Sequence, residues 1–171
     1  MKVAVIVIGG LLIVALTIYV VGALLPQSYR VSRSALFRVP PERLFALIEG
    51  PQDWRPDVTR SETLTDAAGR RLVRETTRDG STIAYELQQS KPPTDRIRRI
   101  ATENLPYSGT GTFLLVRERD ATRVRITEDG DVYNPIFRFV SRFIIGQHRT
   151  IDNYLRGLAK TTNQELAIQN L

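Results

Sequence analysis

The chain contains no cysteine and only one histidine, His148. The absence of cysteine excludes disulfide bonds, thiolate metal sites, iron–sulfur clusters and a cysteine nucleophile. A single histidine without a cluster of supporting ligands also argues against a metal site. We therefore predict neither a metal nor a cofactor.

Lysine is scarce as well, with only Lys2, Lys91 and Lys160, so arginine carries most of the net charge of +6. A basic balance favours anionic partners such as phospholipid head groups or nucleic acid. Arginine richness can also follow from codon composition alone, and we predict no nucleic-acid partner from it.

Charge is absent from residues 3–25, which read VAVIVIGGLLIVALTIYVVGALL. At about 1.5 Å per residue, a helix of this length extends roughly 34 Å and can cross the hydrocarbon layer of a bilayer. The alternative is a cleaved secretory signal peptide, with Val21 and Ala23 as the small residues before the cut. The run exceeds the usual apolar region of about 7 to 15 residues, so we predict an uncleaved transmembrane anchor over residues 1–27.

Basic residues suggest how this anchor is oriented. Only Lys2 precedes the apolar segment, whereas several arginines follow it closely. An excess of basic residues marks the cytoplasmic side of a membrane span. We therefore predict a single-pass membrane protein whose soluble domain faces the cytoplasm. The basic residues that follow the segment are Arg30, Arg33, Arg38 and Arg43.

The rest of the chain has the size of one domain with its own core, over residues 28–162, and a polar tail over 163–171 that we expect to fray. Residues 28–38 and several runs between 57 and 133 predict strands separated by turns, of which Asp79-Gly80 is the strongest hairpin signal. Asn134-Pro135 predicts the start of a long helix whose apolar positions recur as far as Leu158, with a possible kink at Gly146. This order predicts an α+β domain with a helix across one face of an antiparallel sheet.

Several segments resemble a known family. Residues 37–48 (FRVPPERLFALI), followed by Trp54, are similar to the opening of the START-like or SRPBCC superfamily in its polyketide cyclase/dehydrase branch. The resemblance implies a helix-grip fold, in which a seven-stranded sheet curls around a long carboxy-terminal helix. It also implies a hydrophobic ligand between sheet and helix, and no universal catalytic motif. Later landmarks are residues 109–113, 122–128, 134–137 and 151–155.

His148 is the first candidate for chemistry, because it lies between the apolar positions Ile144 and Ile151 of the predicted long helix. Facing the cavity, it would act as a general base with a carboxylate partner, for which Glu128 is a candidate because its strand parity matches that of Ile126. The alternative, which we favour, is a histidine at the edge of the helix.

Aromatic residues are the candidates for binding an apolar ligand, and ordinary core packing is the equally weighted alternative for each. Gly109 and Gly111 lie inside a strand pattern, so we interpret them as sites of sheet bending or close helix approach and not as a phosphate loop. Three arginines of the long helix suggest contact with nucleic acid or anionic lipid, but we interpret them as the solvated face of the helix. The aromatic candidates are Trp54, Tyr85, Tyr107, Tyr133 and Phe143, joined by His148, and the arginines are Arg138, Arg142 and Arg149.

The leading functional hypothesis is a membrane-anchored binding or carrier domain for a hydrophobic or amphipathic small molecule, lipid-like or polyketide-like. The first alternative is a cyclase- or dehydratase-like acid–base enzyme that uses His148. The second is a protein-interaction module without a ligand.

Overall fold

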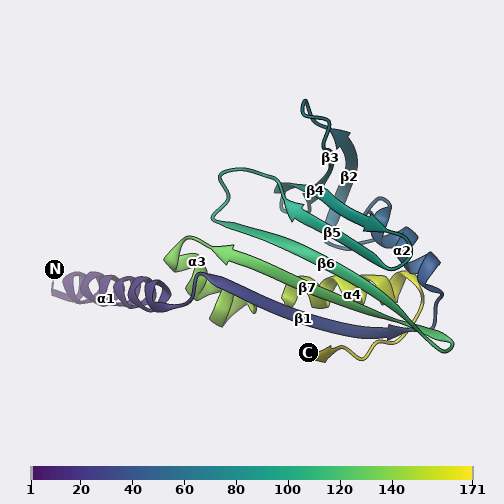
Figure 1. The fold of residues 1–171 in the computed structure, drawn as a ribbon. Coiled ribbons are helices and arrows are strands. Elements are labelled where there is room, and N and C mark those ends of the chain that lie inside the picture. Colours follow the sequence, from purple (N-terminus) through teal and green to yellow (C-terminus); the bar gives the residue numbers. More distant parts are fainter. Residues whose placement is uncertain (1, 171) are drawn as a thin grey trace.

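The computed structural model describes residues 2–170, with every side chain in that range except those of Ala4 and Val5. One helix precedes a domain in which a large sheet carries helices on one face (Figure 1). The elements, in chain order, are α1 (Lys2–Leu24), β1 (Ser28–Phe37), α2 (Pro41–Glu49), β2 (Val58–Thr65), β3 (Arg71–Thr77), β4 (Thr82–Lys91), β5 (Asp95–Ile100), β6 (Tyr107–Glu118), β7 (Ala121–Val132), α3 (Pro135–Val140), the π-helical turn η1 (Ser141–Ile145), α4 (Arg149–Thr161) and β8 (Gln169–Asn170).

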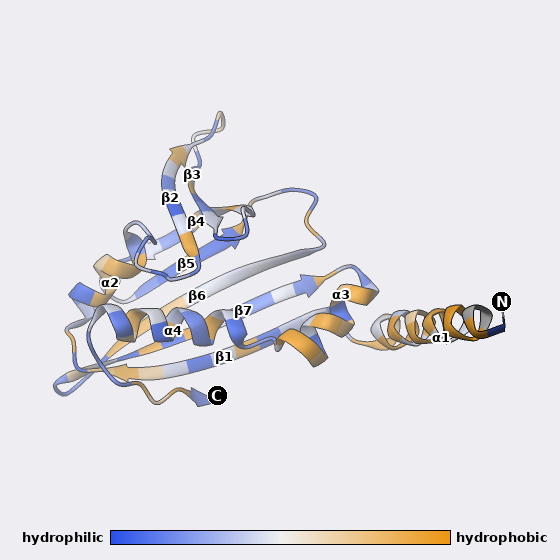
Figure 2. Ribbon diagram, turned by 180° about the vertical axis from the view of Figure 1, so that it is seen from behind, coloured by the Kyte–Doolittle hydropathy of each residue, from blue (hydrophilic) through white to orange (hydrophobic). Residues whose placement is uncertain are grey.

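Helix α1 projects away from the domain, and most of its apolar side chains are exposed along its length (Figures 1 and 2). Within residues 2–170 it is the one helix long and apolar enough to cross a membrane, over Ile6–Leu24. A signal sequence meets the same criterion of length and composition. The helix meets the domain only at its carboxyl end, where Gly22 lies against Pro135 of α3.

The sheet is antiparallel, in the order β2-β3-β4-β5-β6-β7-β1-β8. Strand β1 pairs with β7, the last strand of the meander, from Ser28 opposite Asp131 to Phe37 opposite Thr122. The predicted hairpin at Asp79-Gly80 joins β3 and β4, with Gly80 at a φ of 85° that glycine adopts readily. The predicted α+β class is confirmed.

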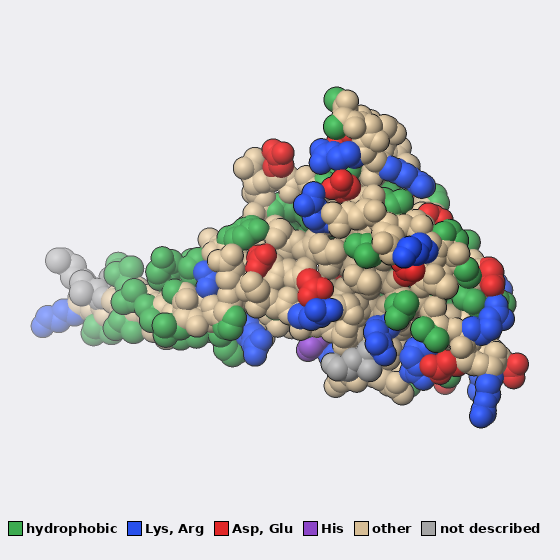
Figure 3. All heavy atoms as spheres, in the orientation of Figure 1, with side chains coloured by type: hydrophobic (Ala, Val, Ile, Leu, Met, Phe, Trp, Pro, Cys, Tyr) green, Lys and Arg blue, Asp and Glu red, His purple; other side chains and the backbone are tan. Residues whose placement is uncertain are grey.

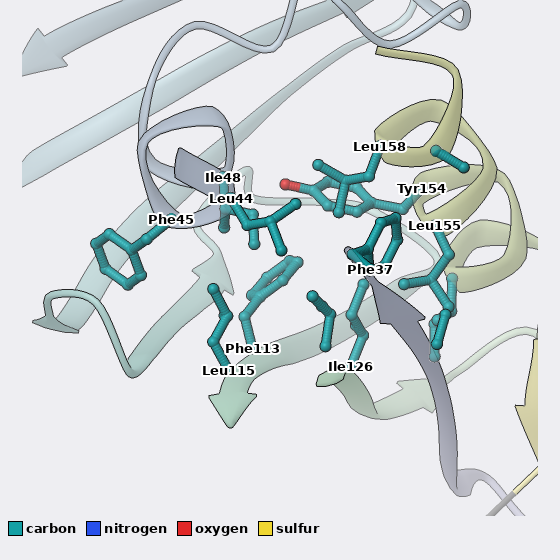
Figure 4. Packing of buried hydrophobic residues seen from close by; sticks show 14 of the residues in the cluster. Phe37, Leu44, Phe45, Ile48, Phe113, Leu115, Ile126, Tyr154, Leu155 and Leu158 are labelled. Atoms are coloured by element: carbon teal, nitrogen blue, oxygen red, sulfur yellow. The ribbon is translucent and has the colours of Figure 1, made fainter. Parts of the chain in front are cut away.

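Helix α4 covers one face of this sheet and supplies much of the core. Its residues Ile151, Tyr154, Leu155 and Leu158 are buried at helical spacing. They pack against strand residues and α2, as Figure 4 shows, and the buried partners include Phe37, Leu44, Ile48, Phe113, Leu115 and Ile126. The helix therefore sits against the sheet as the helix-grip prediction requires.

The prediction of one continuous helix from residue 135 to 158 is wrong. The chain forms α3 and η1, breaks at Gly146 with a φ of 84°, and begins α4 at Arg149. A left-handed residue cannot continue a right-handed helix, so the break rotates the two halves relative to each other. As a result Ile136 and Phe143, expected on the buried stripe, are exposed.

The carboxy-terminal tail also differs from the prediction. Instead of fraying, it returns along the domain, where Leu166 and Ile168 pack against the core. Gln169 and Asn170 then pair with β1 as the short edge strand β8.

Candidate functional site

A cavity of about 300 Å³ lies between the sheet and the segment that runs from α3 into α4. This volume is at the lower end of the range of small-molecule sites, about 300 to 1,000 Å³. Strands β4 to β7, with Tyr29 of β1, form its floor, and α3, η1 and the first turn of α4 form its other wall. Its apolar lining residues are Ile83, Ile100, Phe113, Val132, Phe137 and Ile145.

Two glycines of β6 keep part of this space open. A Cβ atom built on Gly111 would lie 3.5 Å from the Phe113 ring and 3.7 Å from the Arg98 side chain, which are ordinary contacts. The nearest atoms to a Cβ built on Gly109 or Gly111 come from the sheet and not from a helix. These glycines therefore do not serve the close helix approach that the sequence predicted. Both line the cavity, and a larger side chain at Gly111 would project into it.

Glu128 brings a carboxyl group to the cavity wall from β7. Burial raises its pKa from 4.5 to about 7, although Arg98 and Arg55 act in the opposite direction. Within residues 2–170 this carboxyl group has no hydrogen-bond or ion-pair partner, so it is available to a ligand. Near neutral pH it can accept a hydrogen bond as the carboxylate or donate one as the acid.

Arg98 lines the cavity from β5 and belongs to a buried charge network. The Glu75 carboxylate accepts from Arg98 Nη1 at 2.9 Å and from Arg55 Nη1 at 2.7 Å, and Asp57 pairs with the other side of Arg55. Burial is the largest single influence on the pKa of Arg98 and lowers it, but Glu75, Tyr85, Tyr154 and Glu128 together outweigh burial, so the pKa is raised overall. The two guanidinium groups and two carboxylates of this network balance in formal charge, and although Arg98 and Arg55 lower the pKa of Glu128, the effect of burial is larger.

Sequence reasoning did not select Arg98 or Glu75. The signal was present, because Glu75 shares the strand parity of the buried Val73, and Arg98 shares that of the buried Arg96. Arg98 also places its guanidinium 4.4 Å from the centre of the Tyr85 ring, a cation–π contact at the cavity wall.

Among the predicted aromatic residues, Tyr85 and Tyr107 line the cavity, together with Glu128. Burial raises the pKa of Tyr85 to about 12, so its hydroxyl remains a hydrogen-bond donor at physiological pH. The Tyr107 ring stacks on Phe137 with 5.7 Å between ring centres, which connects the sheet to α3.

Three other aromatic candidates lie outside the cavity lining. Trp54 packs edge-on against Tyr154 in the core, and its indole nitrogen donates to the Leu47 carbonyl at 3.0 Å. Tyr133 is exposed, with its hydroxyl donating to Ser108 at 2.8 Å. Phe143 is also exposed.

His148 is exposed at the residue that precedes α4, and it does not line the cavity. The break at Gly146 instead turns Gly146 and Gln147 towards the cavity. The pairing of His148 with Glu128 is therefore absent, and the structure does not supply the geometry that an acid–base role for His148 requires. In residues 2–170, no group of three His, Asp or Glu side chains is placed to hold a metal ion.

Comparison with known proteins agrees with this architecture. A family model described as polyketide cyclase/dehydrase and lipid transport matches residues 28–162. A search of curated proteins finds no match. Solved structures with the same fold include XoxI from Bacillus cereus, with 18% identity over 78% of this chain and 95% of that chain and a TM-score of 0.60.

Two further structures are named for biosynthetic proteins. The di-domain aromatase/cyclase StfQ of the steffimycin biosynthetic pathway is 13% identical over 80% of this chain and 51% of that chain, with a TM-score of 0.61. Norcoclaurine synthase from Thalictrum flavum, in complex with a transition-state analogue, is 10% identical over 80% of this chain and 94% of that chain, with a TM-score of 0.60. At these identities the structural likeness establishes the fold. Because the family model spans most of the sequence, this chain belongs to the polyketide cyclase/dehydrase and lipid transport family of the SRPBCC superfamily.

Proposed function

We propose that this protein is a membrane-anchored binding protein for an amphipathic small molecule. The observation that carries the proposal is the cavity between sheet and helices, which combines a mainly apolar wall with one unpartnered carboxyl group, Glu128. The apolar part of the ligand would fill the space beside Phe113, Val132 and Ile145. A hydroxyl or amino group of the ligand would meet Glu128.

The physical reason for expecting a polar ligand group is that Glu128 is half-buried on the cavity wall and has no hydrogen-bond partner within residues 2–170. A donor on the ligand would form a direct hydrogen bond with this carboxyl group, which is worth about 0.5–1.5 kcal/mol net. Tyr85 and Tyr107 add hydroxyl groups to the same wall, so a ligand with one polar end would be oriented as well as held.

Helix α1 is the proposed anchor. Beyond Lys2 it presents an uncharged apolar surface with no domain residues covering most of it, and burying that surface in lipid is favourable. Tethering would keep the cavity close to a bilayer in which an amphipathic ligand concentrates. The basic residues after α1 support a cytoplasmic domain.

Native mass spectrometry of the full chain, purified in mild detergent, tests ligand binding directly. We expect a co-purifying small molecule bound to the wild type and to Thr112→Val, a neighbouring β6 position outside the cavity lining. In Gly111→Val the new side chain occupies the cavity, so we expect the bound fraction to fall at least about tenfold, equivalent to about 1.4 kcal/mol. A wild-type protein that carries no ligand and takes up no lipid extract component would refute the proposal.

A second candidate function is acid–base catalysis by Glu128, which its pKa near 7 favours, since an efficient general acid or base titrates near the working pH. Glu128 would remove a proton from the bound ligand and return it. Incubation of the co-purified ligand with protein in D₂O would then incorporate deuterium at carbon, and Glu128→Gln would abolish the exchange while retaining the ligand. Binding without exchange would leave the carrier function alone.

A further inference from the structure

The segment formed by α3 and η1, residues 135–145, has two faces with different surroundings. One face contributes Phe137, Ser141 and Ile145 to the cavity lining. The other leaves large apolar side chains in the open, with Ile136 at 50%, Phe143 at 59% and Ile144 at 69% exposed. Packing on the sheet does not account for this outer face, because none of its side chains is buried.

This segment is held against the carboxyl end of α1. Gly22 is buried there, and a Cβ atom at that position would lie 1.9 Å from the Pro135 carbonyl oxygen, so only glycine permits the approach. Arg138 strengthens the contact, because its Nη1 donates to the Leu25 carbonyl at 2.9 Å. In Figure 2 the hydrophobic colouring of α1 is found again on the neighbouring helix α3.

The position of this contact along α1 sets the height of the segment relative to a bilayer. A span over residues 3–25 measures roughly 34 Å, against about 30 Å for the hydrocarbon layer, so the last turn of α1 would lie at the boundary with the head groups. Pro135 touches that last turn at Gly22, and Arg138 bonds Leu25 directly after it. The α3–η1 segment is therefore level with the membrane interface.

Its charges match such a surface. Between Asp131 and Asp152 the sequence contains no acidic residue, whereas it contains three arginines and the only histidine. Arg142 and Arg149 are exposed beside the apolar side chains. Figure 3 shows hydrophobic side chains continuing from α1 onto the adjoining end of the domain, with basic side chains and the histidine beyond them. An apolar face flanked by basic residues is the pattern of segments that lie in the interface of an anionic membrane.

We propose that the α3–η1 segment docks in the interface of the bilayer that α1 crosses, with Phe143 and Ile144 inserted among the lipids and Arg142 and Arg149 beside anionic head groups. The inference rests on the proposed anchor. Since the inner face of the same segment lines the cavity, docking would hold that wall of the cavity at the membrane surface, and a ligand would enter from the lipid without crossing bulk water.

The absence of native cysteine allows a direct test with single-cysteine variants of the full chain. Phe143→Cys and Ile144→Cys, each labelled with the environment-sensitive probe NBD, report on the segment, and both positions are exposed enough to tolerate the label. Val116→Cys is the matched control, because it is an exposed apolar residue at the opposite end of β6 from α3. Leu12→Cys reports separately on insertion of α1.

The proteins are reconstituted in vesicles of phosphatidylcholine with a minority of phosphatidylglycerol, including nitroxide-labelled lipid. We expect NBD at positions 143 and 144 to emit at shorter wavelength and to be quenched severalfold more than at position 116. Quenching at position 12 with no excess at 143 and 144 would overturn the docking inference while leaving the anchor intact. No quenching at position 12 would overturn both, whereas ligand binding is judged independently by mass spectrometry.

Protein density in the vesicles separates lipid docking from docking of a second copy or another protein. The vesicles contain no other protein, so lipid docking predicts quenching that is unchanged when the protein is diluted in lipid. A wavelength shift that disappears on dilution would assign the apolar face to a second copy and would overturn the proposal.

Discussion

Replacement of Glu128 by glutamine should change how the stability of the domain depends on pH. In the folded protein burial raises the pKa of Glu128 to about 7, while the same carboxyl in an unfolded chain titrates near 4.5. Between these two values the folded state retains a proton that the unfolded state has lost. The free energy of unfolding therefore falls as pH rises through this window, and the stability that protonated Glu128 provides is lost above pH 7.

The size of the effect follows from the pKa difference. At about 1.4 kcal/mol per pH unit, the ionised carboxyl destabilises the fold by about 3 kcal/mol at pH 8 relative to pH 4.5. Glutamine has nearly the same shape and does not ionise, so Glu128→Gln should lack this component. The other titrating groups are common to both proteins and cancel in the difference.

Urea denaturation of the full chain in detergent micelles measures this difference, with fluorescence of the single tryptophan, Trp54, as the reporter. Trp54 is suitable because it packs against Tyr154 in the core and should change its emission on unfolding. The stability of Glu128→Gln minus that of the wild type should rise by about 3 kcal/mol from pH 4.5 to 8. Parallel pH profiles for the two proteins would show that Glu128 is not desolvated and would refute the reasoning.

Glu118→Gln provides a control of opposite sign. A side-chain hydrogen bond from Arg123 lowers the pKa of Glu118 in the folded protein. The contribution of Glu118 to the free energy of unfolding is therefore present above its unfolded pKa and is lost as pH falls through its folded pKa. The difference in unfolding free energy between Glu118→Gln and the wild type should therefore change at the acid end of the pH range. A change above pH 6 in this variant would indicate a general effect of the substitution.

Three further substitutions test the fold around the cavity, each by the same denaturation assay. Glu75→Gln should cost about 3–5 kcal/mol, because it leaves the buried guanidinium groups of Arg55 and Arg98 without their shared carboxylate; a loss below 1 kcal/mol would contradict this network. Leu155→Ala should cost about 2–5 kcal/mol, since the side chain is fully buried and its removal leaves a cavity, and an unchanged midpoint would contradict the packing. Gly146→Ala should cost about 1–2 kcal/mol, because its φ of 84° is strained for a residue with a Cβ atom, and a stabilised variant would show that the break between η1 and α4 does not require glycine.

Local sequence patterns were sufficient to predict the class of the fold and several of its parts. Strand alternation, the Asp79-Gly80 turn and the helix start at Asn134 depend on residues that are neighbours in the chain. The Asn134 side chain indeed accepts from the Phe137 backbone amide at 3.1 Å. Strand parity likewise identified Glu128 as inward-facing, because alternation of side chains in a strand is a local property.

The same local reasoning could not locate the functional groups in three dimensions. Gly146 interrupts the apolar repeat with a left-handed residue, and that single backbone conformation places His148 outside the cavity and leaves Phe143 exposed. Glycine permits both signs of φ at similar energy, so the sequence indicated a possible kink but not the rotation that follows it.

The charge chemistry of the cavity depends on contacts between distant strands. Glu75 and Arg98 are 23 positions apart and meet only because β3, β4 and β5 lie side by side. The pKa of Glu128 depends on how much water the folded domain removes from it and on the opposing effect of Arg98 and Arg55, which lie on distant segments of the chain. The sequence by itself determined an uncharged apolar helix and an antiparallel sheet, because those follow from neighbouring residues; only the tertiary structure decided which carboxyl group faces the cavity without a partner, because desolvation and pairing are properties of the assembled fold.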